Sequence, residues 1–138
     1  MFPLSNMHWI LKTEPGAYSY ADLERDKVTH WDGVRNYQAR NNLKAMKQGD
    51  LCLIYESVGP KQIVGTAQVL REAYADPKDA HWVVVDIQVG QRLQRPVSLE
   101  ELKQHPLLKN LSLVKQSRLS VCPVAEENSE IIANFSDL

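Results

Sequence analysis

Three strand-like segments follow one another between residues 51 and 89, and their order constrains the fold more than any other feature of the chain. Leu51–Tyr55 is short and apolar, Ile63–Leu70 contains Gly65, and His81–Val89 alternates apolar with polar residues. The connections between them have the length of hairpins, which favours an antiparallel or mixed sheet over a doubly wound parallel one. Gly65 predicts either a bulge or a close approach of the backbone to another part of the chain.

Helical patterns flank these strands in the sequence. A helix is predicted from Asn36 to about Lys47, because Ala39, Leu43 and Met46 recur at the spacing of one helix face. The other expected elements are a strand at Met7–Lys12, a short helix opened by a capping box of Ser19 and Asp22, a helix begun by Ser98 and Glu101 and stopped by Pro106, a strand at Arg118–Val121 and a helix at Glu126–Phe135. A small sheet with these helices predicts an α+β fold, in which the sheet curls into a small barrel capped by helices.

The length and composition suit one compact unit. A chain of 138 residues, 43% of them hydrophobic, is expected to form a single domain over residues 1–138 with one core. No apolar run reaches the roughly 20 residues of a membrane helix, and the N-terminus lacks a signal-peptide pattern. We therefore expect a cytoplasmic monomer without membrane contact, in which Cys52 and Cys122 stay reduced and pack as small apolar residues.

Familiar catalytic and cofactor patterns are missing from the sequence. There is no glycine-rich phosphate loop and no serine elbow, and the histidines have no metal-like neighbours. No catalytic residue, metal or cofactor is therefore expected. Glu14 and Asp32 form a possible carboxylate pair, although Asp32 before Gly33 is equally well a turn residue. Arg35 is expected to pair with one of these two carboxylates as part of the scaffold.

The segment Trp31–Asn41, WDGVRNYQARN, has the composition of a binding pocket. It combines aromatic rings with a carboxylate, guanidinium groups and carboxamides, and each of these polar groups would need a partner if it were buried. In a pocket the tryptophan ring offers a stacking face, the amides read hydrogen-bonding edges and the arginines hold anions. Two alternatives stay open, namely that Trp31 packs in the core and that Asn36 spends its side chain as a helix N-cap.

Six blocks of the sequence resemble the EVE domain, and the resemblance extends from about Met7 to Phe135. The blocks are Lys12–Thr13–Glu14–Pro15, the segment Trp31–Asn41, Lys47–Gln48–Gly49–Asp50, Tyr55–Glu56–Ser57, Ile63–Val64–Gly65–Thr66–Ala67 and Arg118–Leu119–Ser120–Val121–Cys122–Pro123–Val124. The resemblance implies a PUA-like fold, a small curved-sheet barrel with flanking helices that is related to the YTH and ASCH domains. It also implies a non-catalytic module that binds DNA or RNA carrying a modified nucleobase, such as C5-modified cytosine.

Carried over residue by residue, the resemblance predicts a ligand pocket between the sheet and the helix that begins near Asn36. The predicted pocket residues are Lys12, Trp31, Asn36, Arg40, Tyr55, Ser57 and Ser120. Glu56 departs from the family pattern, because a histidine often stands at this position, and a carboxylate here implies a different ligand. The segment between Tyr74 and Trp82 is also shorter than in many relatives, so that any lid it supplies would be reduced.

Two other functions compete with a nucleic-acid reader. The first is a small enzyme that acts on a nucleotide-like substrate, with Lys12, Glu14 or Asp32 as acid or base. The second is a protein-interaction module that uses the same surface for an acidic partner. Loss of turnover on replacing Glu14 or Asp32 would favour the enzyme. An acidic partner whose affinity is unchanged by Trp31→Ala would favour the interaction module.

Overall fold

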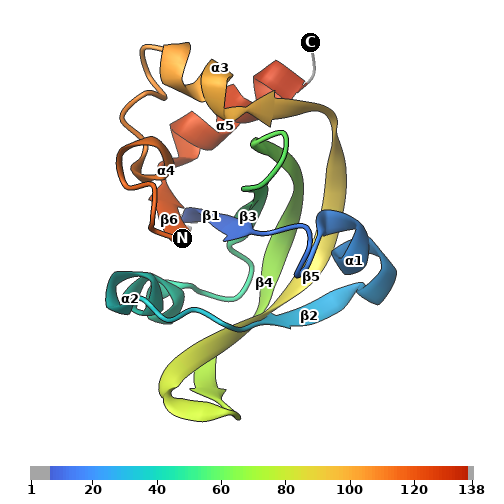
Figure 1. The fold of residues 1–138 in the computed structure, drawn as a ribbon, viewed down its shortest axis with the longest axis vertical. Coiled ribbons are helices and arrows are strands. Elements are labelled where there is room, and N and C mark those ends of the chain that lie inside the picture. Colours follow the sequence, from blue (N-terminus) through green and yellow to red (C-terminus); the bar gives the residue numbers. More distant parts are fainter. Residues whose placement is uncertain (1–6, 137–138) are drawn as a thin grey trace, which may run out of the picture.

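Six strands form one mixed sheet in a computed structural model of the protein, which describes residues 7–136 (Figure 1). The strands are β1 (His8–Thr13), β2 (Val28–Trp31), β3 (Leu51–Glu56), β4 (Gln62–Asp76), β5 (Asp79–Ser98) and β6 (Val121–Val124). Their order across the sheet is β2-β5-β4-β3-β1-β6. β1 runs parallel to β3, and every other neighbouring pair is antiparallel. The first strand therefore lies inside the sheet, between the third and the last.

Five helices accompany the sheet in residues 7–136, and the class is α+β, as predicted. They are α1 (Tyr20–Asp26), α2 (Tyr37–Ala45), α3 (Leu99–Gln104), α4 (Ser112–Lys115) and α5 (Glu126–Ser136). The two predicted capping boxes are confirmed, because Ser19 with Asp22 opens α1 and Ser98 with Glu101 opens α3. No helix in the described part of the chain is long and apolar enough to cross a membrane.

The sheet is strongly curved but does not close into the expected barrel. Irregularities in the β4–β5 register, for example between Ile63 and Gly65, bend both strands (Figure 1). β2 and β6 remain the two edges. α2 packs against β4, β5 and β6, and the Asn42 side-chain amide donates to the Val121 carbonyl of β6 at 2.7 Å. A helix thus lies where strand pairing would have closed a barrel, and it satisfies part of an open edge.

Sequence patterns missed β2 and α4 and underestimated the length of two strands. In β2 only Trp31 is buried, so no apolar alternation marks this strand. β4 and β5 continue beyond Leu70 as a ribbon that turns between Asp76 and Asp79. Its cross-strand contacts include the apolar pair of Ala75 with Val83 and a hydrogen bond of 2.6 Å from the Tyr74 hydroxyl to Asp86. The alternation of His81–Val89 marks the β5 side of the ribbon, but between residues 71 and 76 of β4 only Asp76 is buried, so no buried apolar alternation marks that side.

Gly65 lies against the ring of Tyr20, which confirms the predicted close approach. A Cβ atom at this glycine would stand 2.2 Å from Tyr20 Cζ and 2.6 Å from two further ring atoms. Tyr20 is fully buried, and its hydroxyl donates to the Thr66 carbonyl at 2.8 Å. The ring therefore has no free space into which it can retreat, and α1 is fixed against β4 by this contact.

The variant Gly65→Ala is expected to lower the free energy of unfolding by roughly 1–3 kcal/mol, the usual penalty of overpacking a core. Urea denaturation monitored by circular dichroism would measure the change. Gly16→Ala is the matched control, because nothing lies within 4 Å of a Cβ atom built at Gly16. Equal stability of the two variants would show that the ring of Tyr20 shifts without cost.

Candidate functional site

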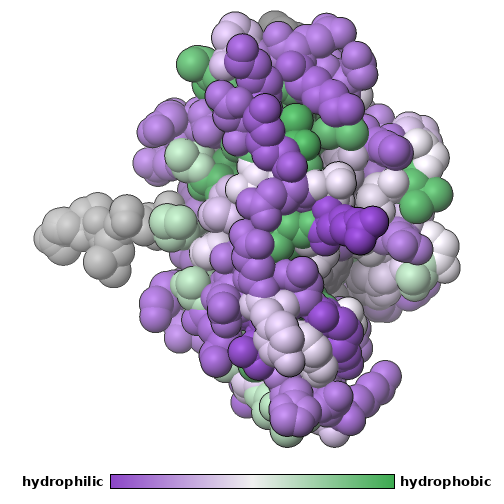
Figure 2. All heavy atoms as spheres, turned by 60° about the vertical axis from the view of Figure 1, so that its left-hand side comes forward, coloured by the Kyte–Doolittle hydropathy of each residue, from purple (hydrophilic) through white to green (hydrophobic). Residues whose placement is uncertain are grey.

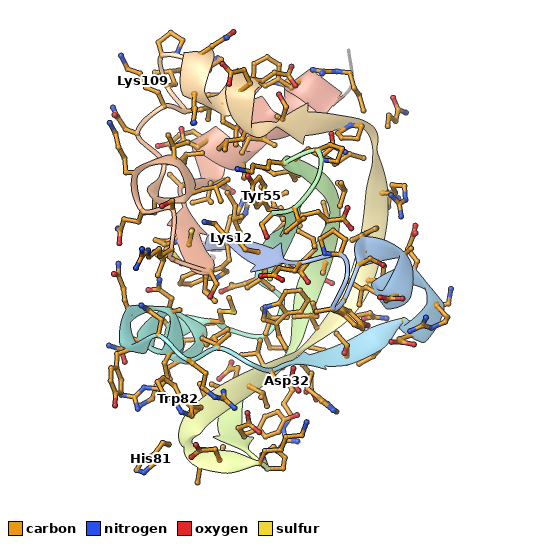
Figure 3. The ribbon with its side chains drawn as sticks, in the orientation of Figure 1. Lys12, Asp32, Tyr55, His81, Trp82 and Lys109 are labelled. Carbon is orange, nitrogen blue, oxygen red and sulfur yellow. The ribbon has the colours of Figure 1, made fainter. Side chains whose placement is uncertain are left out.

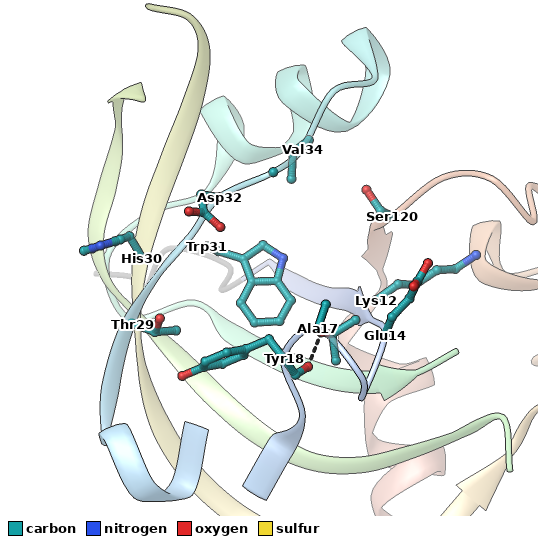
Figure 4. Close-up of a pocket in the computed structure, with 12 residues that line it drawn as sticks. Lys12, Glu14, Ala17, Tyr18, Thr29, His30, Trp31, Asp32, Val34 and Ser120 are labelled. Atoms are coloured by element: carbon teal, nitrogen blue, oxygen red, sulfur yellow. Dashed lines mark hydrogen bonds between the residues drawn. The ribbon is translucent and has the colours of Figure 1, made fainter. Parts of the chain in front are cut away.

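A cavity of about 500 Å³ opens beside Trp31, and we refer to it as the Trp31 cavity (Figure 4). Its walls come from β1 and the loop after it, from β2 and the loop after it, and from Ser120 before β6. These segments are distant in the sequence, and the sheet brings them together. The cavity lies within the range of about 300–1,000 Å³ that is typical of small-ligand sites. α2 contributes no residue to this wall, so the cavity is not the predicted pocket between the sheet and that helix.

Trp31 belongs both to the core and to the cavity wall. It is 7% exposed, ends β2 opposite Val85 of β5, and meets the ring of Tyr18 edge-on at 6.3 Å. Its indole N–H has no hydrogen-bond partner among residues 7–136, and Figure 4 shows this nitrogen on the side of the cavity that faces Ser120. The two interpretations of Trp31, core packing and ligand contact, are therefore compatible.

Lys12 and Ser120 share the opposite wall of the Trp31 cavity. The Lys12 backbone N–H donates to the Ser120 carbonyl at 2.9 Å, which continues the ladder between β1 and β6. The Lys12 ammonium donates to the Ser117 carbonyl at 2.6 Å. Burial lowers the pKa of Lys12, and the neighbouring Cys122 partly offsets this shift. A buried ammonium gains more from an anionic partner than an exposed one does, because water screens it less.

Tyr55 and Ser57 line a second, smaller cavity of about 220 Å³, here called the lysine cavity. Lys12 lines both cavities and is joined here by Lys61 and Lys103, whereas no carboxylate lines the wall. Tyr55 is only 3% exposed, and burial raises the pKa of its hydroxyl. The sequence predicted one pocket from the Trp31 segment and the Tyr55–Ser57 strand end. The structure instead divides these residues between two cavities, and Lys12 lines both.

Asn36 and Arg40 line neither cavity. The Asn36 side-chain oxygen accepts a hydrogen bond of 2.9 Å from the Ala39 N–H, which confirms its interpretation as the N-cap of α2. The Arg40 guanidinium donates to the His81 carbonyl at 3.0 Å, on the β4–β5 ribbon. Direct ligand contacts by these two residues stay predictions. The sequence did not single out Tyr18, because the edge contact of its ring with Trp31 depends on β2, a strand without an apolar pattern.

The predicted partners of Arg35 are wrong, and the reason is the unforeseen length of the β4–β5 ribbon. Arg35 pairs with the buried carboxylate of Asp76 at the tip of this ribbon, at 3.3 Å. Glu14 and Asp32 instead both line the Trp31 cavity and form no ion pair among residues 7–136. The site thus combines an aromatic wall, an ammonium group and two carboxylates that are free to accept hydrogen bonds.

Glu56, which departs from the family pattern, faces α1. Its carboxylate accepts a hydrogen bond of 2.9 Å from the backbone N–H of Tyr20, the first residue of α1. A carboxylate at a helix start satisfies a free donor and interacts favourably with the helix dipole. Glu56 lines neither cavity. It therefore supports the scaffold and adds no direct contact to a ligand.

No group of three or more histidine, cysteine, aspartate or glutamate side chains is arranged to hold a metal ion within residues 7–136. Cys122, which neighbours Lys12, is also poorly suited as a nucleophile. Its burial raises the pKa of the thiol to about 11, although Lys12 opposes the shift. A reactive cysteine needs a thiolate at neutral pH, and a pKa in this range prevents that.

The family model described as "EVE domain" matches residues 7–135 of this chain. Thymocyte nuclear protein 1 of Gallus gallus is 34% identical, and the match covers 94% of this chain and 69% of that protein. A crystal structure of human THYN1 protein in complex with 5-methylcytosine-containing DNA is similar, with 30% identity and a TM-score of 0.87, and the match covers 96% of this chain and 98% of that one.

A more distant likeness supports the fold assignment. The YTH domain of the Zygosaccharomyces rouxii MRB1 protein, solved in complex with N6-methyladenosine RNA, has a TM-score of 0.62 and 13% identity. The match covers 99% of this chain and 90% of that domain. At this identity the likeness concerns the fold alone, and it agrees with the predicted relation to YTH domains.

The native protein is expected to resist alkylation at Cys122. A thiol with a pKa of about 11 is only about 0.1% ionised at about pH 8, whereas an ordinary cysteine is roughly one-quarter ionised. Labelling by iodoacetamide, followed by mass spectrometry, should therefore be at least about a hundredfold slower in the native protein than in urea. Rapid labelling of native Cys122 would contradict this assignment and would restore the thiol as a candidate nucleophile.

Proposed function

The chain belongs to the EVE domain family, and from this premise we propose that it is a non-catalytic reader that accepts a modified nucleobase of DNA or RNA in the Trp31 cavity. The main support is the cavity itself, in which an aromatic wall stands beside hydrogen-bonding groups that have no partner in the described chain. The relative solved with 5-methylcytosine-containing DNA makes C5-modified cytosine the first base to test.

The cavity offers what an extruded base needs. Removing a base from its stack costs a few kcal/mol, and stacking on an aromatic side chain returns roughly 1–3 kcal/mol. Trp31 is the stacking candidate, and its indole N–H and the Ser120 hydroxyl are suited to base acceptors. The carboxylates of Glu14 and Asp32 accept hydrogen bonds only. They favour a base with an exocyclic amino group, such as cytosine, over thymine.

The lysine cavity is suited to the phosphate groups of the same strand. Lys12, Lys61 and Lys103 come from three different segments, and no acidic residue lines the cavity between them. The face that carries α2 and α4 is largely hydrophilic (Figure 2). Because Lys12 lines both cavities, a base in the Trp31 cavity would have its own backbone close to this cationic site. A few phosphate contacts position a strand without reading its sequence.

Discrimination between modified and plain bases is expected to be modest for each contact. Burial of one methyl group gains only about 0.8 kcal/mol, which is roughly a fourfold change in affinity. Larger selectivity would require the plain base to leave a polar group of the cavity unpaired.

We also propose that the protein acts in the cytoplasm as a monomer and requires no metal or cofactor.

One observation favours a second candidate, an enzyme acting on a nucleotide-like substrate. Lys12, Glu14 and Asp32 line the same cavity, and together they could supply an acid and a base. Turnover of a modified nucleoside or oligonucleotide, abolished in Glu14→Gln or Asp32→Asn, would establish this function. Binding without turnover, measured over hours by mass spectrometry of the ligand, would favour the reader.

The parent protein is expected to prefer an oligonucleotide that contains 5-methylcytosine over the plain one, and Trp31→Ala and Ser120→Ala should lose this preference. Fluorescence anisotropy of labelled oligonucleotides would measure the affinities without depending on the removed tryptophan. Because Trp31 also packs in the core, Trp31→Phe keeps an aromatic ring while removing the indole donor. Arg25→Ala, whose side chain pairs with Asp22 and Asp26, is the control.

Equal affinity of the parent for plain and modified strands, repeated with other base modifications, would remove the reader hypothesis. A loss of preference that accompanies unfolding, detected by near-ultraviolet circular dichroism, would not count as support. If Ser120→Ala keeps the preference for the modified strand, while Trp31→Ala is folded but does not bind it, the role of the cavity would be restricted to stacking.

The double variant Lys61→Ala with Lys103→Ala is expected to bind plain and modified strands more weakly, with affinity reduced by the same factor for both. If each lysine meets one phosphate of a single strand, the slope of log affinity against log salt should fall by about 1.4, or about 0.7 for each phosphate that is no longer neutralised. Titrations at several salt concentrations would measure this slope. An unchanged slope would show that the backbone takes another path across the surface.

A further inference from the structure

A cluster of aromatic and cationic side chains outside both cavities joins α2 to the β4–β5 ribbon. The rings of Tyr37 and Trp82 lie 5.1 Å apart with 30° between their planes. The Arg40 guanidinium lies 4.9 Å from the centre of the Tyr37 ring, and that of Arg35 lies 5.5 Å from the centre of the Trp82 ring. Figure 3 shows Trp82 on the ribbon below α2. We call these four residues the Tyr37 platform.

Several contacts hold the two arginines of the platform, whereas Tyr37 itself is exposed. Tyr37 is 65% exposed, so most of its surface faces solvent. Arg40 is fixed by the His81 carbonyl, and Arg35 by the Asp76 carboxylate and the Val34 carbonyl. The Arg40 Nε–H is buried without a partner in the described chain, so the contacts with the two rings and with His81 hold this side chain. An exposed ring held in place loses little conformational freedom when a second ring stacks on it.

The platform begins where the wall of the Trp31 cavity ends. Val34 lines that cavity, and Arg35 follows it directly in the chain. Tyr37 lies three positions after Val34, and an extended chain of three residue steps spans at most about 11 Å. A nucleotide next to the one in the cavity therefore comes within reach of the Tyr37 ring.

The charge of the platform is small, which makes stacking its main means of binding. The cations of Arg35, Arg40 and the nearby Lys78 are largely offset by the carboxylates of Asp76 and Asp79 at the turn of the same ribbon. Aromatic rings beside arginine guanidinium groups form the usual stacking surface for unpaired bases. A base inside a duplex already stacks on both of its faces, so it has no face to offer to such a ring.

We propose that the Tyr37 platform is a second binding site, which stacks an unpaired nucleobase adjacent to the base in the Trp31 cavity. The proposal rests on the proposed function and extends it to single-stranded ligands. Tyr37 also contacts Trp82 and Arg40, but the hydrogen bond from Arg40 to the His81 carbonyl ties α2 to the ribbon without the Tyr37 ring. Substitution of Tyr37 is therefore expected to remove the stacking ring and to leave the ribbon attached to α2.

The test compares Tyr37→Ala with Tyr37→Phe, which keeps the ring and removes only the hydroxyl. With a single-stranded oligonucleotide of about five nucleotides centred on 5-methylcytosine, Tyr37→Ala should bind about tenfold more weakly, within the range for loss of one stacked base. Tyr37→Phe should bind like the parent. All three proteins should bind 5-methyl-deoxycytidine monophosphate equally, because a mononucleotide has no neighbouring base.

A second readout reports stacking directly. With 2-aminopurine placed on either side of the modified base, binding to the parent and to Tyr37→Phe should quench its fluorescence at one of the two positions. Tyr37→Ala should abolish this quenching. The parent should also bind the single strand more tightly than the corresponding duplex. Equal affinity of Tyr37→Ala and the parent for the oligonucleotide, or unchanged quenching, would overturn the proposal.

The two proposals fail in distinguishable ways. If the Trp31 cavity does not read modified bases, the parent binds plain and modified oligonucleotides alike, and Tyr37→Ala still weakens both when the platform stacks a base. If only the platform proposal fails, the preference for the modified strand persists and Tyr37→Ala leaves both affinities unchanged. Equal loss of mononucleotide and oligonucleotide binding in a folded Tyr37→Ala would also overturn the platform, because it would assign Tyr37 to the cavity.

Discussion

The pairing of β1 inside the sheet is the constraint on which the rest of this protein depends. Because β1 lies between β3 and β6, Lys12 stands opposite Tyr55 on one side and hydrogen-bonds through its backbone to Ser120 on the other. These residues are far apart in the chain, and no local structure could bring them together. The two cavities exist because the loops that leave this strand and its neighbours converge at one end of the sheet.

The helix α2 covers part of the open edge of the sheet. It packs between β6 and the long strands, and Asn42 binds the free edge of β6, so the curved sheet stays open without exposing that edge fully. The segment that leads into α2 therefore runs along the surface between the Trp31 cavity and the ribbon. The lysine cavity, the Trp31 cavity and the Tyr37 platform then form one continuous proposed path for a nucleic-acid strand. Lys12 lines both cavities, and Val34 lies where the Trp31 cavity meets the platform.

Side-chain hydrogen bonds were predictable from the sequence where the two partners lie within a few residues of each other. The capping boxes of α1 and α3 and the N-cap at Asn36 depend on spacings of three residues, and all three are present. The close approach at Gly65 was also predictable, although its partner Tyr20 was not. The partner of Arg35 was assigned wrongly because Asp76 lies 41 positions away, at the end of a part of β4 that has no buried apolar alternation.

The sequence by itself determined the starts of α1, α2, α3 and α5, the order of β3, β4 and β5, the α+β class and, through its motifs, the family. These properties follow from short-range hydrogen bonding and from the periodicity of apolar side chains, both of which are written into neighbouring residues. Only the tertiary structure decided that Lys12 serves two cavities, that Glu56 faces α1, and that Tyr37 meets Trp82. Each of these depends on the register of the strands and on a sheet that bends without closing. Many contacts between distant residues fix the register and the bend together, and no single segment encodes them.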